Sequence, residues 1–301
     1  MLKSCQRSKK LQSAMEYLST YGWAILIIAV ALVSLFYLGV FSPYTYAPKM
    51  LPGSCYVVRS NYTAPQLSGD CNGIPEFVTE FNGQNSYVSI NGIAAANGQS
   101  QFTVSLWIYA KSYPSASSSL IYSEGSPQVT LQFGINPSGD LFTQEWYSGS
   151  PILFTSSTAV PLNQWVFVSA KLANGAQGSG TIYIYTDSNP PQSGSGQEEY
   201  SSSATYYTGI GGNIGYLGGQ SLDPFNGMIS NVQVYTTALS TNSINALYQE
   251  GIGGAPIDMQ DLAGWWPLNG NANDYSGAGN NGAVSGISYY NGWFNSGYTA
   301  P

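Results

Sequence analysis

Only carboxylates could perform acid–base chemistry in this chain, because its 301 residues include 15 Asp and Glu and no histidine. Without histidine, Ser-His-Asp catalysis, Cys-His catalysis and imidazole-bound metals are all excluded within the chain. Glycoside hydrolysis needs two carboxyl groups about 5–5.5 Å apart for retention or roughly 6.5–9.5 Å apart for inversion. Glu76 and Glu80 would lie about 13 Å apart on an extended strand, and the adjacent Glu198 and Glu199 would point to opposite faces. The carboxylate spacing therefore predicts that the chain is not an enzyme.

The basic residues are few, and half of them lie at the N-terminus. Four of the eight Lys and Arg occur within residues 1–10, and the formal net charge is −7, so no basic surface remains for nucleic acid. Residues 21–41 carry no charge, and at about 1.5 Å per residue they cover the roughly 30 Å core of a bilayer. We therefore predict one transmembrane helix, with the N-terminus inside and the rest of the chain outside, because the positive charge precedes the helix. A cleaved secretory signal peptide is the alternative.

A second pattern lies just before the apolar stretch. The segment KKLQSAMEYL resembles the archaeal class III signal peptide, a prepilin-like leader that a prepilin peptidase removes immediately before a Gln. The resemblance implies a basic leader at residues 1–11, cleavage between Leu11 and Gln12, and a transmembrane, pilin-like helix at residues 12–41. Leu11 stands where that family usually has Gly. Glu16 would be the fifth mature residue, where it either reaches the lipid headgroups or neutralises the N-terminal amine of a neighbouring copy in a filament.

Residues 42–75 begin as a proline-rich stalk and contain two of the three cysteines. Because Cys5 lies on the inner side or in the leader, Cys55 and Cys71 are left together in an oxidising exterior. We predict a disulfide between them that closes a loop of about 17 residues and contributes about 3 kcal/mol. Two free thiols are the alternative. Inside this loop, Asn61 begins an Asn-Tyr-Thr glycosylation pattern.

After the stalk, apolar residues recur at every second position, which is typical of half-buried antiparallel strands. Strands of this kind are expected at residues 102–109, 129–135 and 166–172. One helix, capped by Ser240 or Thr241, is expected to end at Gly251. Many strands with one short helix predict an all-β fold built as a two-sheet antiparallel sandwich.

Five segments of this region occur in a characteristic order. They are FNGQNSYVSI (81–90), FTVSLW (102–107), LNQWVFV (162–168), TIYIY (181–185) and FNGMISNVQVYTTALS (225–240). Their order resembles the laminin-G-like or concanavalin A-like jelly roll. The resemblance implies a sandwich over residues 76–252, and it implies the binding of glycans or matrix proteins.

Residues 253–301 extend the same resemblance. LAGWWPL (262–268) and DYSGAGNNG (274–282) are similar to the opening strand and loop of the family, although they follow the domain. A circular permutation would let this segment supply the missing first strand of its own sandwich. Strand addition to a neighbouring molecule is the alternative.

Members of the family sometimes bind ligands through calcium held by Asp side chains and loop carbonyls. Asp140, Asp223 and Asp274 lie in Gly- or Pro-rich loops that could supply such oxygen ligands, and Asp274 is the preferred candidate. Solvated turn residues are the alternative. Trp265 and Trp266 are adjacent on an expected strand and so face opposite ways. One is expected in the core, and the other either stacks on a sugar or covers the sheet edge.

Together these features predict a single-pass, membrane-anchored or pilin-like protein that displays a laminin-G-like domain outside the cell. The expected role is adhesion, through binding of carbohydrate or protein. Its partners would be the membrane, a glycan or surface-protein ligand and, in a filament, copies of itself. A structural pilus or envelope subunit without a ligand is the alternative. A carbohydrate-active enzyme is disfavoured because the sequence shows no convergent carboxylate pair.

Overall fold

A computed structural model of the chain describes residues 24–33, 55–57, 67–69, 74–93, 100–115, 118–125, 129–147, 150–175, 180–196, 207–212 and 223–301. The chain divides into two compact units, Met1–Lys49 and Met50–Pro301. In the first unit, residues 24–33 form a helix whose large apolar side chains are exposed. No helix in the described part of the chain is long and apolar enough to cross a membrane.

Several sequence predictions concern residues outside the described ranges. Leu11, Gln12 and Glu16, the residues of the predicted leader cleavage, are among them, and so are Asn61 and Cys71. Cys55 begins the short strand β1 (Cys55–Val57), which pairs with β2 (Leu67–Gly69). The leader, the disulfide and the glycosylation therefore stay predictions.

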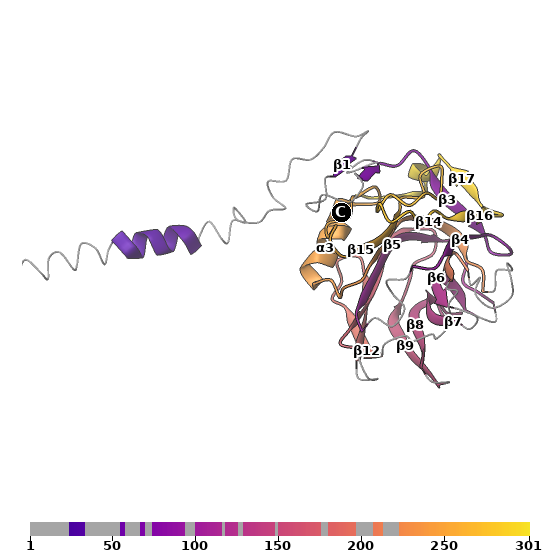
Figure 1. Cartoon of the computed structure of the whole chain (residues 1–301), viewed down its shortest axis with the longest axis horizontal. Helices are drawn as coiled ribbons and strands as arrows, with labels where there is room; N and C mark the ends of the chain where they lie inside the picture. Colours follow the sequence, from indigo (N-terminus) through magenta and orange to yellow (C-terminus); the bar gives the residue numbers. More distant parts are fainter. Residues whose placement is uncertain are drawn as a thin grey trace, which may run out of the picture. The chain divides into compact units, whose positions relative to one another are not determined.

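The second unit is a sandwich of two antiparallel sheets (Figure 1). In order across the eight-stranded sheet, the strands are β12 (Gln192–Gly196), β11 (Gly180–Thr186), β10 (Trp165–Ala173), β5 (Phe102–Ala110), β14 (Asn226–Tyr235), β3 (Val78–Asn82) and β17 (Ser288–Tyr290), with β15 (Leu262–Trp266) also beside β14. In order across the seven-stranded sheet, they are β16 (Ala283–Ser285), β4 (Tyr87–Asn91), β13 (Tyr207–Ile210), β6 (Ser119–Gly125), β7 (Val129–Ile135), β8 (Asp140–Tyr147) and β9 (Ser150–Ala159). The predicted all-β, two-sheet antiparallel sandwich is confirmed.

The local predictions match the observed elements. The three expected strands correspond to β5, β7 and β10, and the expected helix is α3 (Thr241–Glu250). The side chain of Ser240 caps α3 by accepting a hydrogen bond from the backbone N–H of Ser243. Gly251 ends the helix with a positive φ of 79°, a conformation that glycine adopts without a steric penalty.

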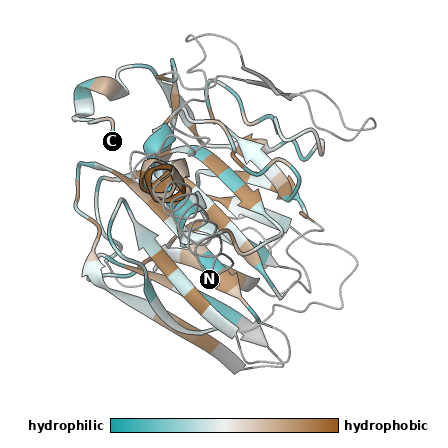
Figure 2. Ribbon diagram, turned by 90° about the vertical axis from the view of Figure 1, so that its left-hand side faces the viewer, coloured by the Kyte–Doolittle hydropathy of each residue, from teal (hydrophilic) through white to brown (hydrophobic). Residues whose placement is uncertain are grey.

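The strands at the centre of the eight-stranded sheet are buried on both faces, whereas the sequence pattern predicted half-buried strands. All nine residues of β5 are buried. Alternate residues of β5 lie in a core between the two sheets, and Trp107 and Tyr109 lie in a second core on the outer face. Figure 2 shows hydrophobic and hydrophilic residues alternating along the strands. Period two was thus correct, but the outer positions of β5 are covered rather than solvated.

The cover of the outer face comes from α3 and from the C-terminal segment. Ile244 and Leu247 of α3 belong to the same cluster as Trp107, and so does Trp293 of the 3₁₀ helix η2 (Trp293–Ser296). Full burial of a large apolar side chain contributes about 1.5–3 kcal/mol. The second core is therefore a major part of what holds the fold together.

The C-terminal segment contributes strands to both sheets of its own chain. β15 pairs with β14, β16 pairs with β4, and β17 pairs with β3. β14 uses its first half to pair with β3 and its second half to pair with β15. The position expected for a permuted first strand is filled from within the chain.

Candidate functional site

A polar pocket of about 480 Å³ lies at one end of the sandwich. Its walls come from the residues after β3, after β5 and before β14. These strand ends meet because Asn226, the first residue of β14, pairs with Asn82, and Gly227 pairs with Ala110. The sheet register thus brings three loops that are distant in sequence to one place.

The wall between the β3 and β14 loops is tightly built. Gly83 has a φ of +68°, and a Cβ on it would lie 2.7 Å from the Asn226 Cβ, so only glycine fits at this close approach. The Asn226 side chain donates to the Ser112 hydroxyl at 2.7 Å. The Asn226 carbonyl accepts from the Lys111 N–H at 3.0 Å. These contacts tie the β5–β6 loop to the start of β14.

Tyr113 is the aromatic side chain of the pocket, and its ring is held in place. Its hydroxyl donates to the Val160 carbonyl at 2.6 Å. The ring packs directly against Gly139, because a Cβ on that residue would lie 2.5 Å from the Tyr113 Cζ. The pocket therefore has a fixed aromatic wall beside the hydroxyls of Ser112, Ser115 and Ser118.

Asp223 is the only charged side chain among the described lining residues. Its backbone has a φ of +52°, a conformation that is uncommon for a residue with a Cβ. Its carbonyl accepts from the Leu120 N–H at 2.8 Å, which fixes the residue against the start of β6. Half-burial of the carboxyl raises the pKa of Asp223 above its ordinary value of 3.8. Strained backbone at a pocket is consistent with a functional position.

The structure does not bring the three predicted calcium ligands into one cluster. Among the described residues, no group of three His, Cys, Asp or Glu could hold a metal ion. Asp140 lies at the start of β8, where its carboxylate accepts from the Asn136 amide at 3.4 Å. Of the three, Asp223 alone lines the pocket.

Asp274, the preferred calcium candidate, organises its own loop, and this expectation is corrected. Its Oδ1 accepts from the N–H groups of Trp265 and Ser276 at 3.0 and 2.8 Å. Its Oδ2 accepts from the Ser276 hydroxyl and the Asn280 N–H, both at 2.9 Å. Because four protein donors already occupy the acceptor sites of this carboxylate, Asp274 stabilises its own loop and offers no free oxygen ligand to a cation.

The expectation that one of the paired tryptophans stacks on a sugar is wrong. Trp265 and Trp266 are both 0% exposed. They face opposite ways, as the alternation predicted, with Trp266 in the core between the sheets and Trp265 in the outer core. The Trp265 indole donates to the Asn231 side chain at 2.8 Å, and the Trp266 indole donates to the Asn280 carbonyl at 2.9 Å. Both rings are structural because both faces of β15 are covered.

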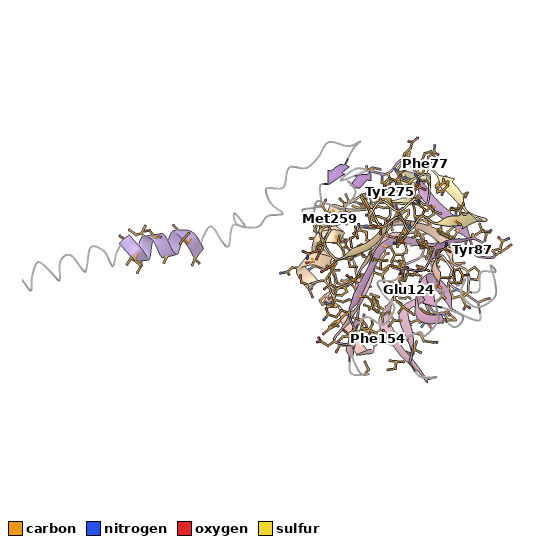
Figure 3. All side chains as sticks on the ribbon, in the orientation of Figure 1. Phe77, Tyr87, Glu124, Phe154, Met259 and Tyr275 are labelled. Atoms are coloured by element: carbon orange, nitrogen blue, oxygen red, sulfur yellow. The ribbon has the colours of Figure 1, made fainter. Side chains whose placement is uncertain are left out.

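Sequence reasoning missed a pair of carboxylates inside the sandwich. Glu124 on β6 and Glu145 on β8 both lie opposite Leu131 on the intervening strand β7, so all three side chains point to the inner core. Their backbones are two strand spacings apart, about 10 Å. Both residues are 2% exposed, and Figure 3 shows Glu124 in the interior of the domain. Both carboxylates therefore lie away from the surface of the domain.

The pocket residues other than Asp223 were also missed. The segment KSYPSASSS, which begins at Lys111, directly follows a strongly alternating strand. Its hydroxyl-rich composition with a Tyr-Pro pair marks a loop with many hydrogen-bonding groups. That signal was available, but only the sheet register shows that Gly83 and Asn226 lie beside it.

Comparison with known proteins places the fold. A family model described as the concanavalin A-like lectin/glucanases superfamily matches residues 82–245. The chain belongs to this superfamily. The match ends before β15, so the C-terminal strands of this concanavalin A-like domain lie outside the family model. No curated protein sequence matches the chain.

Two solved structures share the concanavalin A-like fold at low sequence identity. A candidate carbohydrate-binding protein from Bacteroides ovatus is 20% identical with a TM-score of 0.53, and the match covers 72% of this chain and 60% of that one. A heptameric SAP-like pentraxin from Limulus polyphemus is 16% identical with a TM-score of 0.51, and the match covers 71% of this chain and 94% of that one. At these identities the likeness shows the fold alone.

Proposed function

We propose that the chain binds carbohydrate through the pocket at the end of its concanavalin A-like domain. The observation that carries the proposal is the pocket itself, which combines one carboxylate, one amide, several hydroxyls and a fixed tyrosine ring in about 480 Å³. Ligand sites are concave and use a few placed polar groups to orient the ligand. Sugars present hydroxyls for such groups and apolar ring faces for an aromatic side chain.

Family membership supports a binding role. The superfamily description names lectins and glucanases, and the Bacteroides ovatus relative is described as a carbohydrate-binding protein candidate. The buried position of Glu124 and Glu145 argues against a hydrolase, because acid–base catalysis needs carboxyl groups within hydrogen-bond reach of the substrate.

We further propose that this domain is displayed on the outside of the cell by the N-terminal segment. The apolar residues 21–41, the basic residues before them and the proline-rich residues 42–75 support a membrane-anchored or pilin-like stem. Adhesion to a glycan-bearing surface is the role that joins the stem to the pocket. Calcium at Asp140 or Asp223 stays part of the proposal to be tested.

The proposal is tested by glycan-array binding of the full-length chain, with and without calcium. The detergent should lack a sugar head group, so that it does not compete for the pocket. We expect Ser115→Trp, which places a large ring at the exposed rim of the pocket, to abolish binding. The matched control is Asn242→Trp on the exposed side of α3, which should leave binding unchanged. Equal binding by both variants would overturn the proposed site.

A second candidate function is a structural pilus or envelope subunit. It is favoured by the exposed Val284 and Tyr290 on β16 and β17, which lie at the edges of the two sheets. Exposed apolar edge strands can pair with another copy. Sedimentation of the wild type and of a Val284→Lys variant separates the two functions. A structural subunit should self-associate as wild type and lose this association in the variant, whereas a glycan-binding protein does not require self-association through this edge.

A further inference from the structure

The carboxylate of Asp223 differs from the other well-placed carboxylates of the domain. Asp274 accepts four hydrogen bonds, and Asp187 accepts one from the Phe167 N–H at 2.8 Å. Among the described residues, no N–H or O–H group donates to the Asp223 carboxylate, and burial raises its pKa. Asp223 therefore offers hydrogen-bond acceptors to the pocket that the described protein groups do not use.

The half-buried Asp223 carboxylate stays open to the pocket, where a ligand donor can form a hydrogen bond with it. The backbone of Asp223, with its left-handed φ, lies at the pocket wall. Its carboxylate, which no described donor uses, fits a residue whose partner is supplied from outside the protein.

The described pocket wall contains no cation. Lys111 is the basic residue nearest in sequence, but its ammonium group forms an ion pair with Glu80 and does not line the pocket. The remaining lining groups are hydroxyls, an amide, prolines and glycine. An anionic ligand would meet only the like charge of Asp223, whereas a cationic ligand would form a charge-assisted hydrogen bond with it.

We propose that the pocket selects sugars that donate hydrogen bonds to Asp223, preferring amino sugars over neutral sugars and discriminating against acidic sugars. This inference rests on the proposed function of carbohydrate binding at the same pocket. It assigns Asp223 as the residue that sets the ligand's charge, with the Ser112 and Ser118 hydroxyls available to the neutral parts of the sugar.

The test compares sugars of one series that carry a positive charge, no charge or a negative charge. Glucosamine, glucose and glucuronate, and the corresponding galactose series, are titrated against the full-length chain by saturation-transfer NMR. We expect the amine to bind at least about tenfold more tightly than the acid, because a charge-assisted hydrogen bond replaces like-charge repulsion. The difference should shrink at high salt, because ions screen a partly exposed charge.

Asp223→Asn supplies the decisive variant. Asn accepts the left-handed backbone as readily as Asp, so the fold is expected to be retained, which a thermal melt checks. The variant should bind the three sugars of a series with similar affinities. Asp187→Asn is the matched control, because Asp187 also has a positive φ of 48° and its carboxylate lies outside the pocket. It should preserve the wild-type order.

The outcomes separate this inference from the proposed function. Sugar binding that is independent of charge, or tightest for the acid, overturns the assignment of Asp223 and leaves carbohydrate binding standing. A preference for amines that persists in Asp223→Asn overturns it as well. Failure of every sugar and every array glycan to bind overturns both proposals.

Discussion

Glu124 is a carboxyl group placed in a hydrophobic interior. Its neighbours on the inner face are Tyr122, whose hydroxyl donates to its Oε1, Thr208 on β13, and Glu145 beyond Leu131. Burial raises the pKa of Glu124 from 4.5 to about 7, and the Tyr122 hydrogen bond opposes this rise. The folded state therefore holds a proton that the unfolded state releases at a lower pH.

The raised pKa of Glu124 predicts that the domain is more stable in acid than in base. A carboxyl group with a raised folded-state pKa gives full stability below pH 4.5, and this contribution is lost as the pH rises through about 7. The loss is about 3 kcal/mol by the linkage relation. Denaturant unfolding of the wild type at pH 5 and pH 8 should show it, and Glu124→Gln should remove most of the pH dependence. The control is Glu76→Gln on an exposed loop residue. An unchanged dependence in Glu124→Gln would contradict the prediction.

At the residue scale, the sequence predicted the direction of side chains better than their role. The alternation correctly placed Trp265 and Trp266 on opposite faces of one strand. It could not show that both faces are covered, because the cover comes from α3 and from residues as distant as Trp293. The same alternation places Glu145 on the same face of its strand as Leu141, four residues earlier. Carboxylates are rarely fully buried, so a pattern of hydrophobic residues does not predict that Glu145 lies in the core.

At the element scale, β15 is fixed to β14 by a buried polar network at a β-bulge. The bulge lies between Ser230 and Gln233, and it contains Asn231 with a φ of 53°. The Asn231 side chain accepts from the Trp265 indole at 2.8 Å and from the Gln233 amide at 3.1 Å, and it donates to the Gly254 carbonyl at 2.8 Å. One side chain thus satisfies three buried groups from two strands and a loop.

Asn231→Ala should destabilise the domain by about 2–4 kcal/mol. The substitution leaves the buried indole N–H of Trp265 without its partner, and an unsatisfied buried group costs roughly 1–3 kcal/mol. It also removes the shorter of two hydrogen bonds to the Gly254 carbonyl, which keeps only the one from the Gln233 amide at 3.3 Å. It also places a Cβ without a polar side chain in a left-handed conformation. Equilibrium unfolding in denaturant measures the change, with Asn242→Ala on the exposed side of α3 as the control. A loss below about 1 kcal/mol would show that the network is not what fixes β15.

The strands and helix α3 were predictable because each carries its own local signal. β5 and β10 alternate strictly, and α3 has a serine cap and a terminal glycine. The sheet order was not predictable from such signals. β14 pairs with β3 along its first half and with β15 along its second half. The paired residues are about 150 positions apart in the first case and about 30 in the second, and no local pattern encodes such contacts.

At the scale of the whole domain, residues 253–301 decide whether the sandwich is complete. They add β15 and β17 to the eight-stranded sheet and β16 to the seven-stranded sheet, and they place Trp265, Trp266 and Trp293 in the two cores. The segment also returns to the start of the domain, because the Trp293 indole donates to the Pro75 carbonyl at 2.9 Å. Its end therefore lies beside the first strand-forming residues of the sandwich.

Because the two ends of the domain lie close together, we predict that residues 254–301 are essential for folding, but that they can stand either before or after the rest of the domain in the sequence. Deleting residues 254–301 should abolish cooperative unfolding, because the inner core loses Trp266 and the outer core loses Trp265 and Trp293. Burial of each of these rings contributes about 1.5–3 kcal/mol. A permuted domain, in which residues 254–301 precede residues 74–253 through a short glycine-rich linker, should unfold cooperatively with near-native stability. Near-UV circular dichroism and denaturant unfolding measure both. Cooperative unfolding of the deletion variant at wild-type stability would show instead that the first 253 residues contain the complete folding unit.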